Sequence, residues 1–138
     1  MWDKEKAIEA LRKNAPPNQP NLGQCAHYTR MAIEVGGLKL KHHESAKDYG
    51  SSLQAVGFVK VPNVHYQHQS GDVGIVHPIP NHPHGHMAMF DGTIWISDFR
   101  QHHGLYLGAT YRKLKKGYDI YRYQVLWDGA WPSAANFA

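Results

Sequence analysis

The sequence is poor in several features that mark particular classes of protein. Its 138 residues include one cysteine, Cys25, which excludes an internal disulfide bond and any zinc site built from several thiolates. No stretch approaches the ~18 consecutive apolar residues of a membrane-spanning helix. The first segment, MWDKEKAIEALRK, is charged and amphipathic, unlike a secretory signal. We therefore expect a protein that is made in the cytoplasm, has no membrane partner and does not use the general export pathway.

The charged residues show an excess of positive charge without a dense cluster. Fifteen Lys and Arg stand against eleven Asp and Glu, for a formal net charge of +4, and eleven histidines add charge in acid. Such a chain favours anionic partners. Nucleic acid is one of them, but a base-stacking surface needs exposed aromatic residues beside basic ones. Trp95 and Phe99 lie in a stretch too apolar for that role, so we expect core packing and no nucleic-acid binding.

The order of the sequence patterns predicts an α+β fold. Apolar residues recur at helical spacing over 3–13, 24–35 and 45–55. In the second of these segments the predicted core-facing stripe consists of Tyr28, Met31, Ala32 and Val35. Strands are predicted later, over residues 58–61, 73–76, 86–90, 93–99 and 118–126. We expect one domain, residues 1–138, with N-terminal helices packed on a mostly antiparallel sheet.

Cys25 lies at the start of the helix predicted over 24–35. Unpaired N–H groups and the helix dipole favour an anion there, so we expect a lowered pKa for the thiol. The same N–H groups suit the oxyanion that forms when a thiolate attacks a carbonyl group. Cys25 also stands three residues before Tyr28, at the top of the predicted stripe. It is therefore a candidate nucleophile, with a buried apolar filler as the alternative.

A cysteine nucleophile needs an imidazole within hydrogen-bond reach and a third group that orients the ring. The stretch GHMAMFDGTIWISDFRQ indicates a hairpin that turns at Asp91-Gly92, with His86 before the turn and Asp98 after it. A two-residue turn places His86 opposite Ser97, whereas a three-residue loop places His86 and Asp98 on one face. Asp98 is the better orienting group because a carboxylate stabilises the imidazolium, and Ser97 is the alternative.

The histidines around this hairpin raise a second alternative, a metal-dependent hydrolase. The loop HPIPNHPHGH offers four imidazoles, which suit zinc. They belong to His77, His82, His84 and His86. Their spacing follows no ligand pattern that we can motivate, and a proline-rich loop holds ligands poorly. We therefore expect no metal and no other cofactor.

Four blocks of the sequence together carry a family resemblance. They are GQCAHYTRMAIEVGG, SAKDYGSSLQAVGF, SGDVGIV and GHMAMFDGTIWISDFRQ, and they cover roughly residues 20 to 101. In this order they resemble the NlpC-type and CHAP-type cysteine peptidases and amidases of peptidoglycan. The shared combination is a cysteine that opens a helix, a Gly-Asp before a strand, and a Gly-His strand followed by Trp-x-Ser-Asp-Phe.

This resemblance implies a papain-like fold and a role for each site residue. Cys25 is then the nucleophile, His86 the general base and Asp98 the third catalytic residue. Gln101 lies near the position where some CHAP members carry an amide side chain, and Gln24 stands where many members have an acidic residue before the cysteine. The residues expected to contact the substrate are Gln24, Tyr28, Ser97 and Gln101.

The resemblance also implies a substrate, a route and a partner. The substrate is peptidoglycan, cleaved at an amide bond of the peptide stem or crosslink that the sequence does not specify. The small size, without an export signal or a wall-binding module, looks most like the amidase effectors that type VI secretion delivers to the periplasm of a target bacterium. A phage lysin of the same chemistry is the alternative. An effector implies a cognate immunity protein, expected to plug the cleft between Cys25 and His86.

Overall fold

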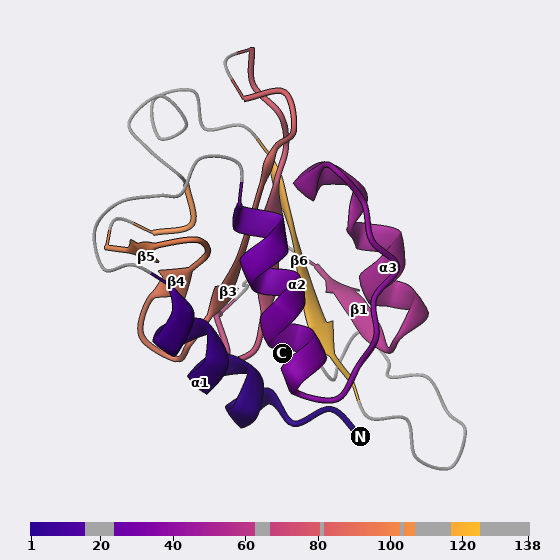
Figure 1. The fold of residues 1–138 in the computed structure, drawn as a ribbon. Helices are drawn as coiled ribbons and strands as arrows, with labels where there is room; N and C mark the ends of the chain where they lie inside the picture. The colour runs from indigo at the N-terminus through magenta and orange to yellow at the C-terminus, as the bar shows by residue number, and fades with distance from the viewer. Residues whose placement is uncertain (16–23, 63–66, 81, 103, 107–116, 125–138) are drawn as a thin grey trace.

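The structure, a computed structural model, describes residues 1–15, 24–62, 67–80, 82–102, 104–106 and 117–124, and its helices precede its strands (Figure 1). The helical elements are α1 (Lys4–Asn14), α2 (Cys25–Val35), the 3-10 helix η1 (Ala46–Asp48) and α3 (Gly50–Ala55). The strands are β1 (Phe58–Val61), β2 (Val73–Val76), β3 (His86–Phe90), β4 (Trp95–Ile96), β5 (Arg100–Gln101) and β6 (Tyr118–Tyr123). The predicted α+β class is confirmed.

Within the described residues these strands form one sheet in the order β1-β6-β2-β3-β4-β5. Every neighbouring pair is antiparallel, as the sequence predicts. The late strand β6 lies between β1 and β2, so it joins the two halves of the sheet. In Figure 1, α2 and α3 lie in front of the sheet, and α1 packs beside α2. None of the described helices is long and apolar enough to cross a membrane.

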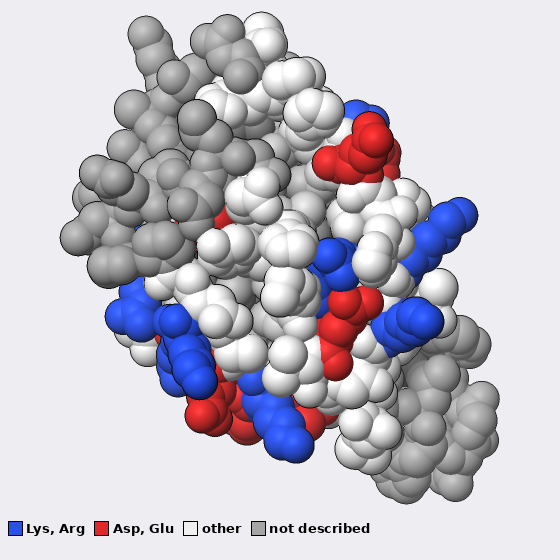
Figure 2. Space-filling view, viewed as in Figure 1, with Lys and Arg blue, Asp and Glu red and all other residues white. Residues whose placement is uncertain are grey.

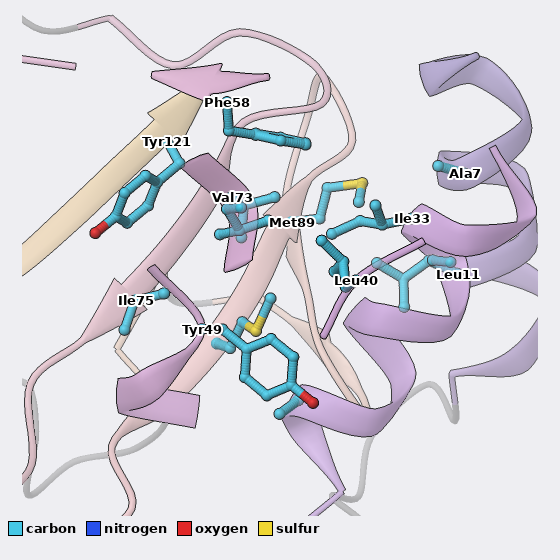
Figure 3. Packing of buried hydrophobic residues seen from close by; sticks show 14 of the residues in the cluster. Ala7, Leu11, Ile33, Leu40, Tyr49, Phe58, Val73, Ile75, Met89 and Tyr121 are labelled. Carbon is cyan, nitrogen blue, oxygen red and sulfur yellow. The ribbon is translucent and has the colours of Figure 1, made fainter. Parts of the chain in front are cut away.

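The main core fills the layer between the helices and the sheet. Helix α1 begins as predicted, because the Asp3 side chain accepts a hydrogen bond from the Lys6 N–H at 3.1 Å and caps the helix. Its buried residues are Ala7, Ile8 and Leu11, as its apolar spacing predicts. Figure 3 shows side chains from α1, α2 and the sheet meeting in this layer, among them Leu11, Ile33 and Met89. This core sets the position of α2 on β3.

The predicted core-facing stripe of α2 is wrong at two of its members. Met31 is 41% exposed and Val35 is 55% exposed. The buried residues of this helix are Ala26, Thr29, Ala32 and Ile33. Three of these four side chains are small, which lets the helix lie close to the sheet. Met31 and Val35 therefore remain on the outer surface of α2, whereas Ile33 is buried.

The helix predicted over 45–55 divides into η1 and α3. Tyr49 separates them and serves as the C-cap of the first and the N-cap of the second. Gly50 opens α3 for a steric reason: a Cβ atom there would lie 2.4 Å from the hydroxyl oxygen of Tyr121 on β6. The glycine that interrupts this pattern thus allows α3 to pack closely on the sheet.

Candidate active site

Cys25 is the first residue of α2, and the backbone of β3 holds it in place. Its Sγ accepts a hydrogen bond from the backbone N–H of Met87. Thr29 donates from its hydroxyl to the carbonyl oxygen of Cys25 at 2.9 Å and to that of Met87 at 3.5 Å. Strand β4 pairs with β3 only at Met89 and Phe90, the C-terminal end of β3. The backbone of Met87 is therefore not paired with β4 and can contact α2. The predicted helix start therefore lies against the residue that follows His86.

Burial determines the acidity of the Cys25 thiol. Its pKa is raised to about 11, chiefly because desolvation penalises the thiolate, with a further contribution from the carboxylate of Asp98. The N–H of Met87 acts in the opposite direction and is outweighed. Our expectation of a lowered pKa at the helix N-terminus is therefore wrong, because loss of water outweighs the favourable field. At neutral pH the resting site holds a protonated thiol.

A glycine sets the position of His86 at the start of β3. Gly85 has φ +73, and a Cβ atom on it would lie 2.6 Å from the carbonyl oxygen of Val76. Only glycine fits a left-handed conformation this close to a neighbouring strand. His86 then pairs with Val76 across β2 and β3 and is 1% exposed. The close approach of Gly85 to β2 therefore places the imidazole of the next residue in a buried position.

Gln101 determines the tautomer of the His86 ring. Its amide NH2 donates to the carbonyl oxygens of Gly104 and Leu105 at 2.9 and 2.8 Å. Its Oε1 therefore faces the ring and lies 2.6 Å from His86 Nε2. Because an amide oxygen only accepts, Nε2 carries the proton and Nδ1 keeps its lone pair. Nδ1 is buried and has no hydrogen-bond partner within the described structure, so it is a free basic nitrogen.

His86 is neutral in the folded protein at pH 7. Burial lowers the pKa of its imidazole to about 4, because the charged ring loses its water. The hydrogen bond to Gln101 raises the pKa by less, and the nearby His82 lowers it slightly. Thiol and imidazole are thus both uncharged at rest.

Acid is expected to destabilise the fold through His86. An unfolded chain protonates this imidazole near pH 6.5, whereas the folded protein resists until about pH 4. The unfolded state therefore binds more protons in this window, and stability is lost as the pH falls from 6.5 to 4. The loss from this group is ~3 kcal/mol. Urea unfolding at pH 7 and pH 4 measures it.

His86→Gln is the variant that isolates this contribution, because it lacks the titrating ring. It is expected to lose less stability between the two pH values than the wild type. His42→Gln is the matched control, since the His42 side chain is 62% exposed. An equal acid loss in the wild type and in His86→Gln contradicts the expectation.

The hairpin between β3 and β4 closes in neither of the two predicted ways. Phe90 pairs with Trp95, so the loop consists of residues 91–94. Asp91 shapes this longer loop, because its Oδ1 accepts hydrogen bonds from the N–H groups of Thr93 and Ile94 at 2.8 and 2.7 Å. Both predicted registers are wrong for this reason, and the strand predicted over 93–99 shortens to β4.

Asp98 lies in the tight turn that follows β4. Its carboxylate accepts a hydrogen bond from the Ser97 hydroxyl at 3.1 Å and another from the backbone N–H of Gln24. Burial raises the pKa of this carboxyl group. Asp98 is thus near Cys25, at the start of α2, while Gln101 holds the position at the His86 ring that we expected for Asp98.

Gln101 reaches the ring because the chain folds back after this turn. Strand β5 pairs with β4, with Trp95 opposite Gln101. A strand of two residues leaves no periodic pattern, so the sequence did not predict it. Gln101 is 3% exposed and Ser97 is fully buried. The Gln101 amide is hydrogen-bonded to His86 and to the backbone of residues 104 and 105, and the Ser97 hydroxyl is hydrogen-bonded to Asp98.

The other two predicted substrate-contact residues lie on the accessible side of the helix start. Gln24 is exposed and immediately precedes Cys25. Tyr28 lines a cavity of about 260 Å³ together with Asn14, His27 and Met31. The described lining of the cavity lies along α2 and at the end of α1, and Tyr28 is three residues from the candidate nucleophile.

The loop histidines that raised the metal alternative have separate partners. His77 Nε2 lies 3.1 Å from an oxygen of Asp119, and His84 hydrogen-bonds to Ser45. Among the residues that the structure describes, no three His, Cys, Asp or Glu side chains come together where they could hold a metal ion.

Two solved structures are similar to this chain, and both are type VI effector-immunity complexes, Tae3-Tai3 from Ralstonia pickettii. The native complex matches with 46% sequence identity and a TM-score of 0.82, over 89% of this chain and 100% of the matched chain. The selenomethionine complex matches with 47% identity and a TM-score of 0.77, over 85% and 99%. No protein-family model and no curated protein sequence matches the chain.

Proposed function

Because this chain belongs to the family of the type VI effector Tae3, we propose that it is a secreted antibacterial effector that hydrolyses an amide bond of peptidoglycan. We assign the chemistry to Cys25 and His86, on a papain-like fold that residues 1–138 form as one domain. The helix that begins at a cysteine and packs on an antiparallel sheet with a histidine supports this assignment. No metal or other cofactor takes part in the proposed reaction.

One observation carries the proposed chemistry: a buried histidine has one nitrogen held and the other unused, and the residue that follows it contacts the cysteine. Gln101 fixes His86 Nε2 as a donor, and Nδ1 is buried with its lone pair free. The following residue, Met87, donates its N–H to the Sγ of Cys25. Burying an unpartnered polar atom costs free energy, and such groups concentrate at catalytic sites. A general base for the Cys25 thiol explains it.

The reaction proceeds in two halves. In the first, the Cys25 thiol gives its proton to His86 Nδ1 while Sγ attacks the amide carbonyl carbon, and the carbonyl π electrons move to oxygen. Backbone N–H groups at the start of α2 stabilise this oxyanion. A lone pair of electrons on the oxyanion then re-forms the carbonyl double bond and the carbon–nitrogen bond breaks. His86 gives its proton to the leaving amine. A thioester on Cys25 and a free amine result.

In the second half, water hydrolyses the thioester. His86 takes a proton from a water molecule while the water oxygen attacks the thioester carbonyl carbon and the carbonyl π electrons move to oxygen. The carbonyl double bond then re-forms and the carbon–sulfur bond breaks. Sγ leaves with the bonding electrons and recovers the proton from His86, which restores the neutral pair. The product is a carboxylic acid. Digestion of purified peptidoglycan, followed by mass spectrometry of the fragments, tests the activity and identifies the amide from the new ends.

Gln101→Leu is expected to lower kcat by ~10²-fold or more, because the ring then loses the acceptor that fixes its tautomer. A ring with the proton on Nδ1 cannot accept the thiol proton at that atom. The ¹⁵N chemical shifts of His86 report the tautomer directly, and we expect them to change in this variant along with kcat.

Asp98→Asn is the matched comparison for the orienting role. An Asn side chain is nearly isosteric and keeps one acceptor oxygen for these donors, while the negative charge near Cys25 is removed. We expect the ¹⁵N shifts of His86 to keep the wild-type tautomer pattern. If Asp98→Asn alters the tautomer and Gln101→Leu does not, the orienting role passes from Gln101 to Asp98.

The family relationship also supports the proposed biology. Both similar structures contain an effector bound to its immunity protein. We therefore assign this chain a cognate immunity protein that covers the site around Cys25 and His86, and delivery into the periplasm of a target bacterium. This relationship favours an effector over the phage lysin of the same chemistry.

A further inference from the structure

The cavity at Tyr28, three residues along α2 from Cys25, has the make-up of a substrate subsite. It measures about 260 Å³ and is lined by Asn14 at the end of α1 and by His27, Tyr28 and Met31 on α2. We call these four residues the α2 pocket. We propose that the α2 pocket binds the carboxylate-bearing end of a short peptide whose amide is cleaved at Cys25. The inference rests on the proposed function, because this peptide is part of the substrate.

Helix geometry limits how far the α2 pocket lies from the reacting amide. Residues three apart on a helix are surface neighbours, so Tyr28 adjoins Cys25. Met31 is six residues beyond Cys25, and a rise of 1.5 Å per residue places it ~9 Å along the helix axis. An extended peptide covers about 3.3 Å per residue. The α2 pocket therefore receives groups within about two or three residues of the cleaved amide.

His27 supplies a hydrogen-bond donor whose direction is fixed by Arg30. A guanidinium nitrogen of Arg30 lies 3.1 Å from His27 Nδ1. Since guanidinium only donates, Nδ1 accepts, and the proton of the neutral ring is on Nε2. Arg30 is itself held by Glu34 at 2.7 Å and by His42 Nε2 at 3.0 Å, and its side chain is 13% exposed. His27 therefore offers Nε2–H as a donor, and the ion pair of Arg30 with Glu34 holds the other side of the ring.

The rest of the α2 pocket combines apolar contact with a second polar group. Met31 is 41% exposed, and an exposed thioether gives a surface that adapts to short aliphatic groups. Asn14 adds an amide that can donate. Figure 2 shows that most of the surface over α2 carries no charged side chain. Polar and apolar surface contribute about equally to the α2 pocket, so it can hold a polar group and an apolar group of one ligand side by side.

The polar groups of the α2 pocket favour a carboxylate over a neutral carbonyl. None of its four described lining residues is acidic, so none of these side chains repels an anion. A hydrogen bond to an ionised acceptor is about twice as strong as one between neutral groups. The volume is below the ~300–1,000 Å³ of pockets that hold drug-sized molecules, which suits one terminal residue of a peptide. A short aliphatic side chain beside a free carboxylate fits these features.

Two synthetic stem peptides test the proposal by hydrolysis. In both peptides the C-terminus lies two residues beyond the cleaved amide. It is a free carboxylate in one peptide and a carboxamide in the other, and the peptides are otherwise identical. The wild type is expected to prefer the carboxylate by about tenfold or more in kcat/KM. His27→Phe, which keeps a ring but removes Nε2–H, should abolish this preference through KM. Met31→Glu should reverse it by charge repulsion.

His42→Phe is the matched control. It removes the other histidine that accepts a hydrogen bond from Arg30, but it does not line the α2 pocket. It is expected to keep the wild-type preference. A preference that His42→Phe loses as fully as His27→Phe overturns the proposal, as does a wild type without any preference.

Binding to the inactive Cys25→Ala protein separates this proposal from the proposed function. The carboxylate peptide is expected to shift the NMR signal of the Met31 methyl group, and the carboxamide peptide to shift it only at roughly tenfold higher concentration. A shift at Met31 without hydrolysis by the wild type supports the α2 pocket and contradicts the proposed function. Hydrolysis without a shift at Met31 overturns the α2 pocket and leaves the proposed function intact.

Discussion

Cys25→Ala is expected to abolish the hydrolysis of peptidoglycan, with a loss of at least ~10⁴-fold in kcat. The proposed reaction has no other nucleophile, and water alone attacks an amide far more slowly. His86→Gln should cause a loss of similar size, because the imidazole is the base that the protonated thiol requires. Fragment release from purified peptidoglycan, followed by mass spectrometry, measures both.

The two substitutions are also expected to be non-additive. Groups that act as one unit lose their function together, so the double variant should be no slower than either single variant. Cys25 is partly exposed at a helix end, so Cys25→Ala should keep the melting temperature of the wild type within a few degrees. Full activity in a folded Cys25→Ala protein would show that the nucleophile is elsewhere.

Arg122→Met is expected to destabilise the fold by about 3–5 kcal/mol, the largest effect on stability that we anticipate. Arg122 on β6 makes two contacts with Asp72, at 2.8 and 3.0 Å, and the Asp72 side chain is fully buried. Asp72 also accepts a hydrogen bond from the Gln69 N–H at 2.9 Å. Removal of the guanidinium leaves a buried charge without its counterion. The free energy of unfolding in urea measures the loss.

The double variant Asp72→Asn with Arg122→Met identifies the cause. It removes the charge together with its partner and keeps an acceptor for the Gln69 N–H, so it should recover much of the lost stability. Lys60→Met is the matched control from the neighbouring strand, because the pair of Lys60 and Asp119 is 54% and 26% exposed. It should cost less than ~1 kcal/mol. Equal losses in Arg122→Met and Lys60→Met would contradict this interpretation of burial.

Helix capping and apolar spacing predicted the main helices and strands, because neighbouring residues in the sequence determine where these elements form. Asp3 caps α1, and the apolar spacing after it gives the buried face directly. For α2 the same spacing rule selected Met31 and Val35, which are exposed. A spacing rule weights large apolar residues, whereas the close approach of α2 to β3 requires small ones. Which side of a helix faces the sheet thus depends on the partner surface.

The sequence predicted the two reactive residues of the candidate site but not the residue that orients the imidazole. Cys25 and His86 stand at the starts of α2 and β3, which their sequence contexts mark. Gln101 meets His86 only because the chain reverses twice, once through the loop that Asp91 shapes and once through the turn at Asp98. Neither reversal has a periodic signal. The direction of the thiol pKa was also missed, because burial depends on the assembled fold.

The protonated state of Cys25 has a consequence for oxidation. Peroxide and disulfides react with the thiolate, and a thiol with a pKa of about 11 is ionised in only ~1 molecule in 10⁴ at pH 7. An ordinary thiol is ionised in about one molecule in thirty at this pH. At equal thiolate reactivity, Cys25 should therefore oxidise about three hundredfold more slowly than an exposed cysteine. A protein that depends on one sulfur atom can in this way survive an oxidising compartment with the atom still reduced.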